Sequence, residues 1–197
     1  MSLVVLMSGG FDSSLAAAMA VDEGISVIPV FIDYGQRALE RELEASRRIC
    51  AQLGLEPPTV VDLSGFGRSV PSGLTRNDMD LNADAFLPGR NLLFLVAAAS
   101  VAFSRGAAGV VIGLLDESSA IYPDQTASFV QAAERAIEAA LGSRIKILTP
   151  LITVSKGAVM QLAQARGISE TYSCHLGQEE PCGECIACRE ILNSGTQ

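Results

Sequence analysis

The sequence predicts an α/β fold in which an open, doubly wound parallel sheet is covered by helices on both faces. Short apolar runs rich in Val and Ile alternate along the chain with longer Ala-rich or amphipathic segments. Most of these longer segments end at a glycine, as at Gly24 and Gly54, and glycine is a common helix stop. In such a fold, ligands bind at the carboxyl ends of the strands.

The expected elements follow one another from the first residues. Residues 3–7 are wholly apolar and suit a buried parallel strand. Further strands are expected at 26–32, 58–62, 109–113 and 145–148, and helices at 13–23, 38–53, 91–105, 124–141 and 155–166. The polar stretch 63–89 and the segment 114–123 interrupt this pattern, and long loops are usually functional. We therefore expect both to border the ligand site.

The composition is that of a globular protein, with 197 residues, 49% of them hydrophobic. We expect residues 1–168 to form the α/β domain and residues 169–197 a small subdomain. The net charge of −8 disfavours nucleic acid as a partner. The longest near-apolar run, 92–103, is shorter than the roughly 20 residues of a membrane span, and no secretory signal is evident, so we expect a cytoplasmic protein with no membrane association.

The segment Ser8-Gly9-Gly10-Phe11-Asp12-Ser13 follows the first strand and opens the first helix. Two glycines alone would suit a tight turn. However, the flanking serines and the strand-loop-helix setting favour a phosphate site, where backbone N–H groups and the helix start face an anion. Asp12 would either bind Mg²⁺ or turn away to fix the loop. The segment resembles the signature of the PP-loop ATP pyrophosphatases, which have the adenine nucleotide alpha hydrolase-like fold. This resemblance implies ATP as cofactor.

Four late cysteines, Cys174, Cys182, Cys185 and Cys188, are spaced C-x7-C-x2-C-x2-C. Cytoplasmic thiols stay reduced, so this cluster predicts metal ligands before disulfides. Four thiolates close tetrahedrally around Zn²⁺ as a structural site. An iron-sulfur cluster and a redox pair are the alternatives. His175 is expected to be a solvated neighbour of the cluster.

Four further segments complete an ordered set of motifs along the chain, together with the glycine segment and the cysteines. These segments are residues 33–37, 87–91, 122–124 and 172–174. The ordered set resembles the 7-cyano-7-deazaguanine synthase family across nearly the whole chain. The resemblance implies a homodimeric ligase of queuosine biosynthesis. In this reaction ATP adenylates 7-carboxy-7-deazaguanine, ammonia converts the adenylate to an amide, and a second activation and dehydration give the nitrile.

The resemblance also implies roles for individual residues. Cations oppose the charge that develops on the nucleotide, carboxylates pair with the amino edge of a guanine-like base, and aromatic rings stack on it. The catalytic candidates are Lys156, Arg90 and Asp12; the ATP-binding candidates are Ser8, Gly9, Gly10, Asp12 and Ser13; the substrate-binding candidates are Asp33, Tyr34, Gln36, Arg37, Arg90, Asn91, Tyr122 and Asp124.

The chain departs from the family pattern at the expected acceptor end. Ala38 stands where members usually have His, and Gln125-Thr126 stand where they have Cys-Arg. These departures keep two alternatives open: a PP-loop enzyme that adenylates a different heterocyclic carboxylate, and one that modifies a tRNA base.

Overall fold

Five parallel strands form one sheet in the order β3-β2-β1-β4-β5. The structure is a computed structural model that describes residues 1–194. The strand bounds are β1 Ser2–Leu6, β2 Ser26–Asp33, β3 Thr59–Asp62, β4 Gly109–Val111 and β5 Lys146–Leu148. The chain builds outward from β1 to β3 and then returns to the other side of β1. This reversal is the topological switch point, where ligands bind in open α/β sheets.

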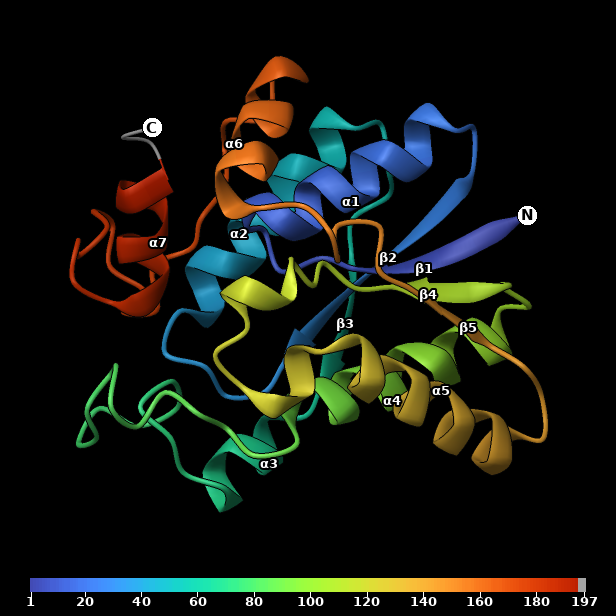
Figure 1. Cartoon of the computed structure of the whole chain (residues 1–197), viewed down its shortest axis with the longest axis horizontal. Coiled ribbons are helices and arrows are strands. Elements are labelled where there is room, and N and C mark those ends of the chain that lie inside the picture. Colours follow the sequence, from blue (N-terminus) through green and yellow to red (C-terminus); the bar gives the residue numbers. More distant parts are fainter. Residues whose placement is uncertain (195–197) are drawn as a thin grey trace.

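Helices cover both faces of the sheet (Figure 1). One layer holds α1 (Phe11–Asp22), α2 (Leu39–Gln52) and α6 (Lys156–Ala165), and the other holds α4 (Arg90–Ser104) and α5 (Ala127–Leu141). Alternate residues of β1 supply the two cores. Val5 packs with the α1 layer, whereas Val4 packs with the α4 layer. Both are fully buried, which explains why β1 is apolar on both sides.

The expected strands and helices are confirmed to within a few residues, and two helices are additional. The segment 63–89 is not free of regular structure, because it contains the short helix α3 (Ser64–Ser69). The segment 169–194, called the tail below, contains α7 (Ile186–Ser194). The helix expected from residue 124 begins instead at Ala127, since the Thr126 hydroxyl caps it by accepting from Phe129 N at 3.2 Å. A separate 3-10 turn, Pro123–Gln125, precedes it.

The tail folds back onto the end of the sheet where the segment 8–13 follows β1. Tyr172 N donates to the carbonyl of Gly9 at 2.9 Å. Asn82, in the segment 63–89, accepts from Ile186 N at 2.9 Å and donates to the carbonyl of Glu184 at 3.3 Å. The tail therefore contacts both the segment 8–13, called the phosphate loop below, and the segment 63–89, called the long loop. The division into 1–168 and 169–197 stays a prediction, and residues 195–197 lie outside the described residues.

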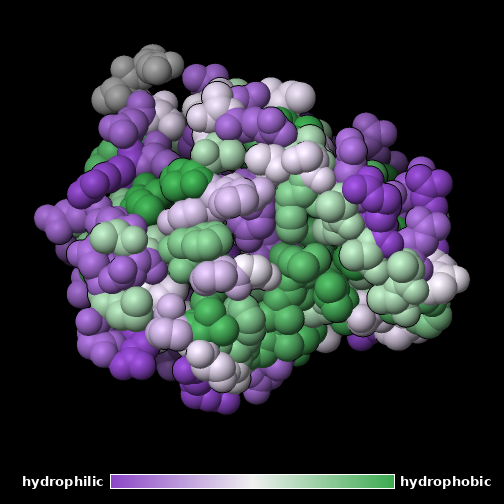
Figure 2. Space-filling view, turned by 60° about the horizontal axis from the view of Figure 1, so that its bottom comes forward, coloured by the Kyte–Doolittle hydropathy of each residue, from purple (hydrophilic) through white to green (hydrophobic). Residues whose placement is uncertain are grey.

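Hydrophobic residues gather in a patch on one face of the molecule, in the lower middle of Figure 2, with hydrophilic residues around it. Leu92, Val96 and Phe103 are 39%, 44% and 52% exposed, and all three belong to α4. Within residues 1–194, no helix combines the length and apolarity that crossing a bilayer would require.

Candidate active site

A cavity of about 290 Å³ lies where β1, β2 and β4 end. The cavity is bounded by the start of α1, the start of α4 and the tail. Its walls are therefore built from segments that are far apart in the sequence. The polar residues that line it are Ser8, Asp12, Ser13, Tyr34, Gln36, Glu42, Arg90, Asn91, Gln125, Lys156, Tyr172, Ser173, His175 and Glu190.

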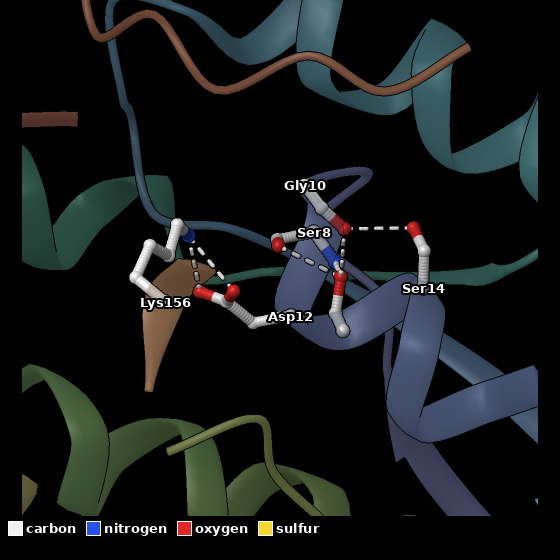
Figure 3. Close-up of polar contacts among 6 residues, drawn as sticks. Ser8, Gly10, Asp12, Ser14 and Lys156 are labelled. Atoms are coloured by element: carbon white, nitrogen blue, oxygen red, sulfur yellow. Dashed lines mark hydrogen bonds and ion pairs between the residues drawn. The ribbon is translucent and has the colours of Figure 1, made fainter. Parts of the chain in front are cut away.

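The phosphate loop is held by its own serines (Figure 3). Ser8 N donates to the hydroxyl of Ser13 at 3.2 Å, and the hydroxyl of Ser14 donates to the carbonyl of Gly10 at 2.7 Å. Gly10 is the N-cap of α1, and no side chain caps the helix there. The N–H groups of the first turn therefore remain available to an anion.

Gly9 lets this loop approach α2 closely. Its φ is +82°, and a Cβ added there would lie 2.6 Å from the carbonyl oxygen of Glu42 and 2.7 Å from the backbone nitrogen of Ser46. These neighbours are backbone atoms of a helix, which move little. Only glycine fits this position without displacing the loop or α2.

We expect Gly9→Ala to lower the free energy of unfolding by about 3 kcal/mol, because left-handed strain adds to the collision with α2. Gly54→Ala is the matched control. Gly54 has φ +67° and nothing within 4 Å of an added Cβ, so strain alone should cost about 1 kcal/mol. Urea denaturation of both variants measures the difference. Equal losses would show that the contact with α2 is unimportant.

Asp12 and Lys156 form an ion pair across the cavity wall (Figure 3). Lys156 Nζ donates to both carboxylate oxygens of Asp12, at 2.8 and 2.9 Å. The two side chains are 28% and 13% exposed, so the pair is largely sheltered from water. Lys156 is the first residue of α6, and Asp12 lies in the first turn of α1. A cation is thus fixed beside the phosphate loop.

Aromatic rings and one cation form another part of the cavity. The guanidinium carbon of Arg90 lies 5.9 Å from the ring centroid of Tyr34 and 6.0 Å from that of Phe94. The two rings are 5.2 Å apart between centroids. Burial, followed by the carboxylate of Glu42, raises the pKa of Tyr34 to about 12. This part suits a flat ring that carries negative charge.

The structure brings most of the predicted site residues together. Nine of them line the cavity: Ser8, Gly10, Asp12, Ser13, Tyr34, Gln36, Arg90, Asn91 and Lys156. The others do not line it. Gly9 packs against α2, as described above. Asp33 accepts from Gly35 N at 2.9 Å, and Arg37 donates to the carbonyl of Gly73 at 3.3 Å.

The last two predicted residues lie beside the start of α4 and the long loop. The carboxylate of Asp124 accepts from Asn91 N at 3.2 Å, and the side-chain amide of Asn91 donates to the carbonyl of Asp124 at 2.8 Å. The ring of Tyr122 stacks on Phe86 with centroids 4.9 Å apart. Asp124 thus binds its own segment to the start of α4, and Tyr122 packs that segment against the long loop.

Several lining residues were not predicted from the sequence, among them Glu42, Phe94 and Glu190. His175, expected to be solvated, is instead half-buried and lines the cavity. Burial and then the charge of Arg90 lower the pKa of His175 to about 4. Its Nδ1 is buried and has no hydrogen-bond partner among the described residues. No spacing or periodicity in the sequence distinguishes these residues.

The four cysteines of the tail come together as a potential metal site. Their sulfur atoms all lie within 4.8 Å of one another, and none is in a disulfide. Cys182 N donates to Sγ of Cys174 at 3.4 Å, and Cys185 N donates to Sγ of Cys182 at 3.3 Å. Four sulfur ligands this close together fit a tetrahedral metal such as Zn²⁺. Cys188 belongs to α7, which also carries Glu190 of the cavity wall.

Comparison with known proteins gives consistent matches. The sequence model of the family described as queuosine biosynthesis protein QueC matches residues 2–194. The 7-cyano-7-deazaguanine synthase of a Nitratiruptor species is 38% identical over 96% of this chain and 91% of that protein. The corresponding synthase of Nautilia profundicola is 36% identical over 94% of this chain and 89% of that protein.

Solved structures share the fold at low sequence identity. The NMN synthetase from Francisella tularensis superposes with a TM-score of 0.59 at 15% identity, over 100% of this chain and 78% of that one. The NH3-dependent NAD synthetase from Campylobacter jejuni gives a TM-score of 0.54 at 17% identity, over 86% and 65%. These likenesses establish the fold alone.

Proposed function

Because the chain belongs to the queuosine biosynthesis protein QueC family, we propose that it converts 7-carboxy-7-deazaguanine and ammonia to 7-cyano-7-deazaguanine in an ATP-dependent reaction. The chain is an enzyme, since its curated relatives are synthases. The alternatives of a different heterocyclic carboxylate or a tRNA base are not favoured, because the most similar relatives share one name despite the departures at Ala38, Gln125 and Thr126.

The observation that carries this proposal is one cavity with two chemically distinct parts. The phosphate loop and Lys156 offer N–H groups and a cation to a triphosphate. Tyr34, Phe94 and Arg90 offer aromatic walls and a cation to a flat, anionic ring. Both parts line the same cavity, which supports a reaction between a substrate carboxylate near Arg90 and the nucleotide.

The following roles are proposed on this basis. Ser8, Gly10 and Ser13 hold the phosphates, and Gly9 supports their loop against α2. Asp12 holds Lys156 in place, and Lys156 stabilises charge on the phosphates as AMP is transferred. Mg²⁺ would accompany ATP and neutralise its triphosphate. The substrate pocket would be formed by Tyr34, Gln36, Arg90 and Asn91, with Asp33, Arg37, Tyr122 and Asp124 fixing the loops around it.

The proposed reaction uses ATP twice. In the first activation, a carboxylate oxygen attacks the α-phosphorus and pyrophosphate leaves, giving an acyl adenylate. Ammonia then displaces AMP and leaves an amide. In the second activation the amide oxygen is adenylated, and loss of AMP with two protons gives the nitrile. Each activation turns an oxygen that would leave slowly into a good leaving group.

The test is product analysis of the purified, metal-loaded protein with Mg-ATP, ammonium and 7-carboxy-7-deazaguanine. We expect two AMP and two pyrophosphate for each nitrile, measured by mass spectrometry and a pyrophosphate assay. The control reaction omits the deazapurine and should release little AMP. If AMP release does not depend on the deazapurine, the proposed substrate is wrong.

Three further properties are proposed with this function. The cysteine cluster would hold a structural Zn²⁺. Because reduced thiolates and ATP are both found in the cytoplasm, we place the enzyme there. The exposed apolar stripe of Leu92, Val96 and Phe103 supports a homodimer, since such faces usually mark an interaction surface. The mass of the protein in solution decides this last point.

A further inference from the structure

Glu42 is a carboxylate on the cavity wall that the motifs do not include. It lies in the first turn of α2. The side-chain amide of Gln36 donates to Oε2 of Glu42 at 3.1 Å. Gln36 is itself buried and fixed, because its Oε1 accepts from Tyr34 N at 2.9 Å and its Nε2 also donates to the carbonyl of Ile32 at 3.2 Å. The position of Glu42 is therefore set by a rigid neighbour.

Glu42 also keeps one oxygen free. Among residues 1–194, no group donates a hydrogen bond to its Oε1, and it forms no ion pair. Asp12 differs, because both of its oxygens accept from Lys156. Glu190 lies close to that same pair: burial raises the pKa of Glu190, the charge of Lys156 lowers it, and the charge of Asp12 raises it. Glu42 thus offers the cavity a carboxylate oxygen without a local partner.

The surroundings of Glu42 bring the pKa of its carboxyl group close to neutral pH. Burial raises its pKa to about 7, while the bond from Gln36 and the charge of Arg90 oppose this rise. The other titratable groups that interact with it are the phenols of Tyr34 and Tyr172. The pKa of each phenol is raised, so both stay neutral near pH 7. A carboxylate in this environment can accept a proton and release it again.

The proposed reaction needs such a group. When ammonia attacks the acyl adenylate, the new C–N bond leaves a positively charged nitrogen. This nitrogen loses one proton as the electron pair of the C–O bond leaves with AMP. After the second adenylation the same nitrogen loses two more protons, and the C≡N bond forms as AMP leaves again. Every one of these protons must be accepted near the bound substrate.

We propose that Glu42 is the base that takes these protons from the reacting nitrogen. The inference rests on the proposed function and adds a catalytic residue to it. Gln36, which also lines the proposed substrate pocket, then has a second role, because its side-chain amide positions Glu42. The adenylation steps need no proton acceptor, so Glu42 should matter for amide and nitrile formation and not for activation.

Glu42→Gln tests this separation, because it keeps the size of the side chain and removes the base. The first measurement is pyrophosphate–ATP exchange that depends on 7-carboxy-7-deazaguanine, which reports adenylation alone. We expect exchange to stay within about threefold of the wild type, whereas amide formation falls by about 10²-fold or more. Glu44→Gln is the matched control, since Glu44 lies on the same helix with its side chain 54% exposed and should leave both rates unchanged.

Two further measurements exclude a merely structural role. At a constant concentration of unprotonated ammonia, the wild-type rate of amide formation should rise with pH through about 7, because only deprotonated Glu42 accepts a proton. This rise should disappear in Glu42→Gln. Hydroxylamine should restore most of the lost rate, since its adduct carries a more acidic nitrogen that water can deprotonate.

The outcomes distinguish a failure of the proposed function from a failure of the role of Glu42 as base. If the wild type shows no exchange that depends on the deazapurine, the proposed function fails and Glu42 has no such reaction to serve. If the wild type is active and Glu42→Gln forms amide at the normal rate, the role of Glu42 as base is wrong. If Glu42→Gln loses exchange to the same extent as amide formation, Glu42 binds the substrate or supports the fold, and its role as base is again rejected.

Discussion

Replacing Lys156 by methionine is expected to lower AMP release by about 10²- to 10³-fold, the usual effect of removing one group that stabilises transition-state charge. The substitution removes the cation that lies beside the phosphate loop and leaves the carboxylate of Asp12 without its partner. The measurement is the steady-state release of AMP from radiolabelled ATP at saturating deazapurine. Thermal unfolding of the same preparation verifies that the protein is folded.

Lys146→Met is the matched control, because Lys146 is the only other lysine of the sequence and is exposed on β5. It should retain normal activity. The double variant Asp12→Asn with Lys156→Met separates two causes, since it removes the unpaired negative charge as well. Activity that stays low in the double variant supports a direct action of Lys156 on the nucleotide, whereas recovery to wild-type activity would contradict it.

Replacing Cys185 by serine is expected to remove most of the bound metal and to lower activity by more than about 10-fold. Cys185 is fully buried and belongs to the cluster. The cluster links the segment around Tyr172 to α7, and both contribute to the cavity wall. Loss of the metal should therefore disturb the cavity as well as lower the melting temperature.

Elemental analysis of the purified protein measures this effect and also identifies the metal, since zinc and iron are resolved separately. Cys50→Ala is the control, because Cys50 is buried in the core against α1 and lies outside the cluster. It should keep a full complement of metal. If Cys185→Ser also kept its metal and activity, the cluster would not be the metal site.

The fold was largely predictable because its signals are local. Each strand is a short apolar run, and most helices end at a glycine, so the alternation is visible in the sequence. The helix α3 was missed because its six residues include two glycines, Gly65 and Gly67, which weaken any helical pattern. The helix α7 was not predicted, because the cysteine spacing in that region indicates a metal site and does not indicate a helix.

Much of the cavity wall was predictable, either because a motif follows a strand directly or because the family resemblance indicates the residue, as for Arg90, Asn91 and Lys156. Ser8, Gly10 and Ser13 follow β1, and the structure places them on the cavity wall. Glu42 and Glu190 could not be found in this way. They reach the cavity from helices whose position depends on tertiary packing, and nothing in the spacing of either helix marks one glutamate above its neighbours.

The bond between Tyr172 N and the carbonyl of Gly9 has a consequence for the order in which the protein is made. The phosphate loop is synthesised well before the segment around Tyr172, which completes its cavity. A growing chain can thus form the sheet from β1 to β5 while the cavity beside the phosphate loop stays open on one side. The site becomes complete only when the tail has emerged and its cysteines have gathered.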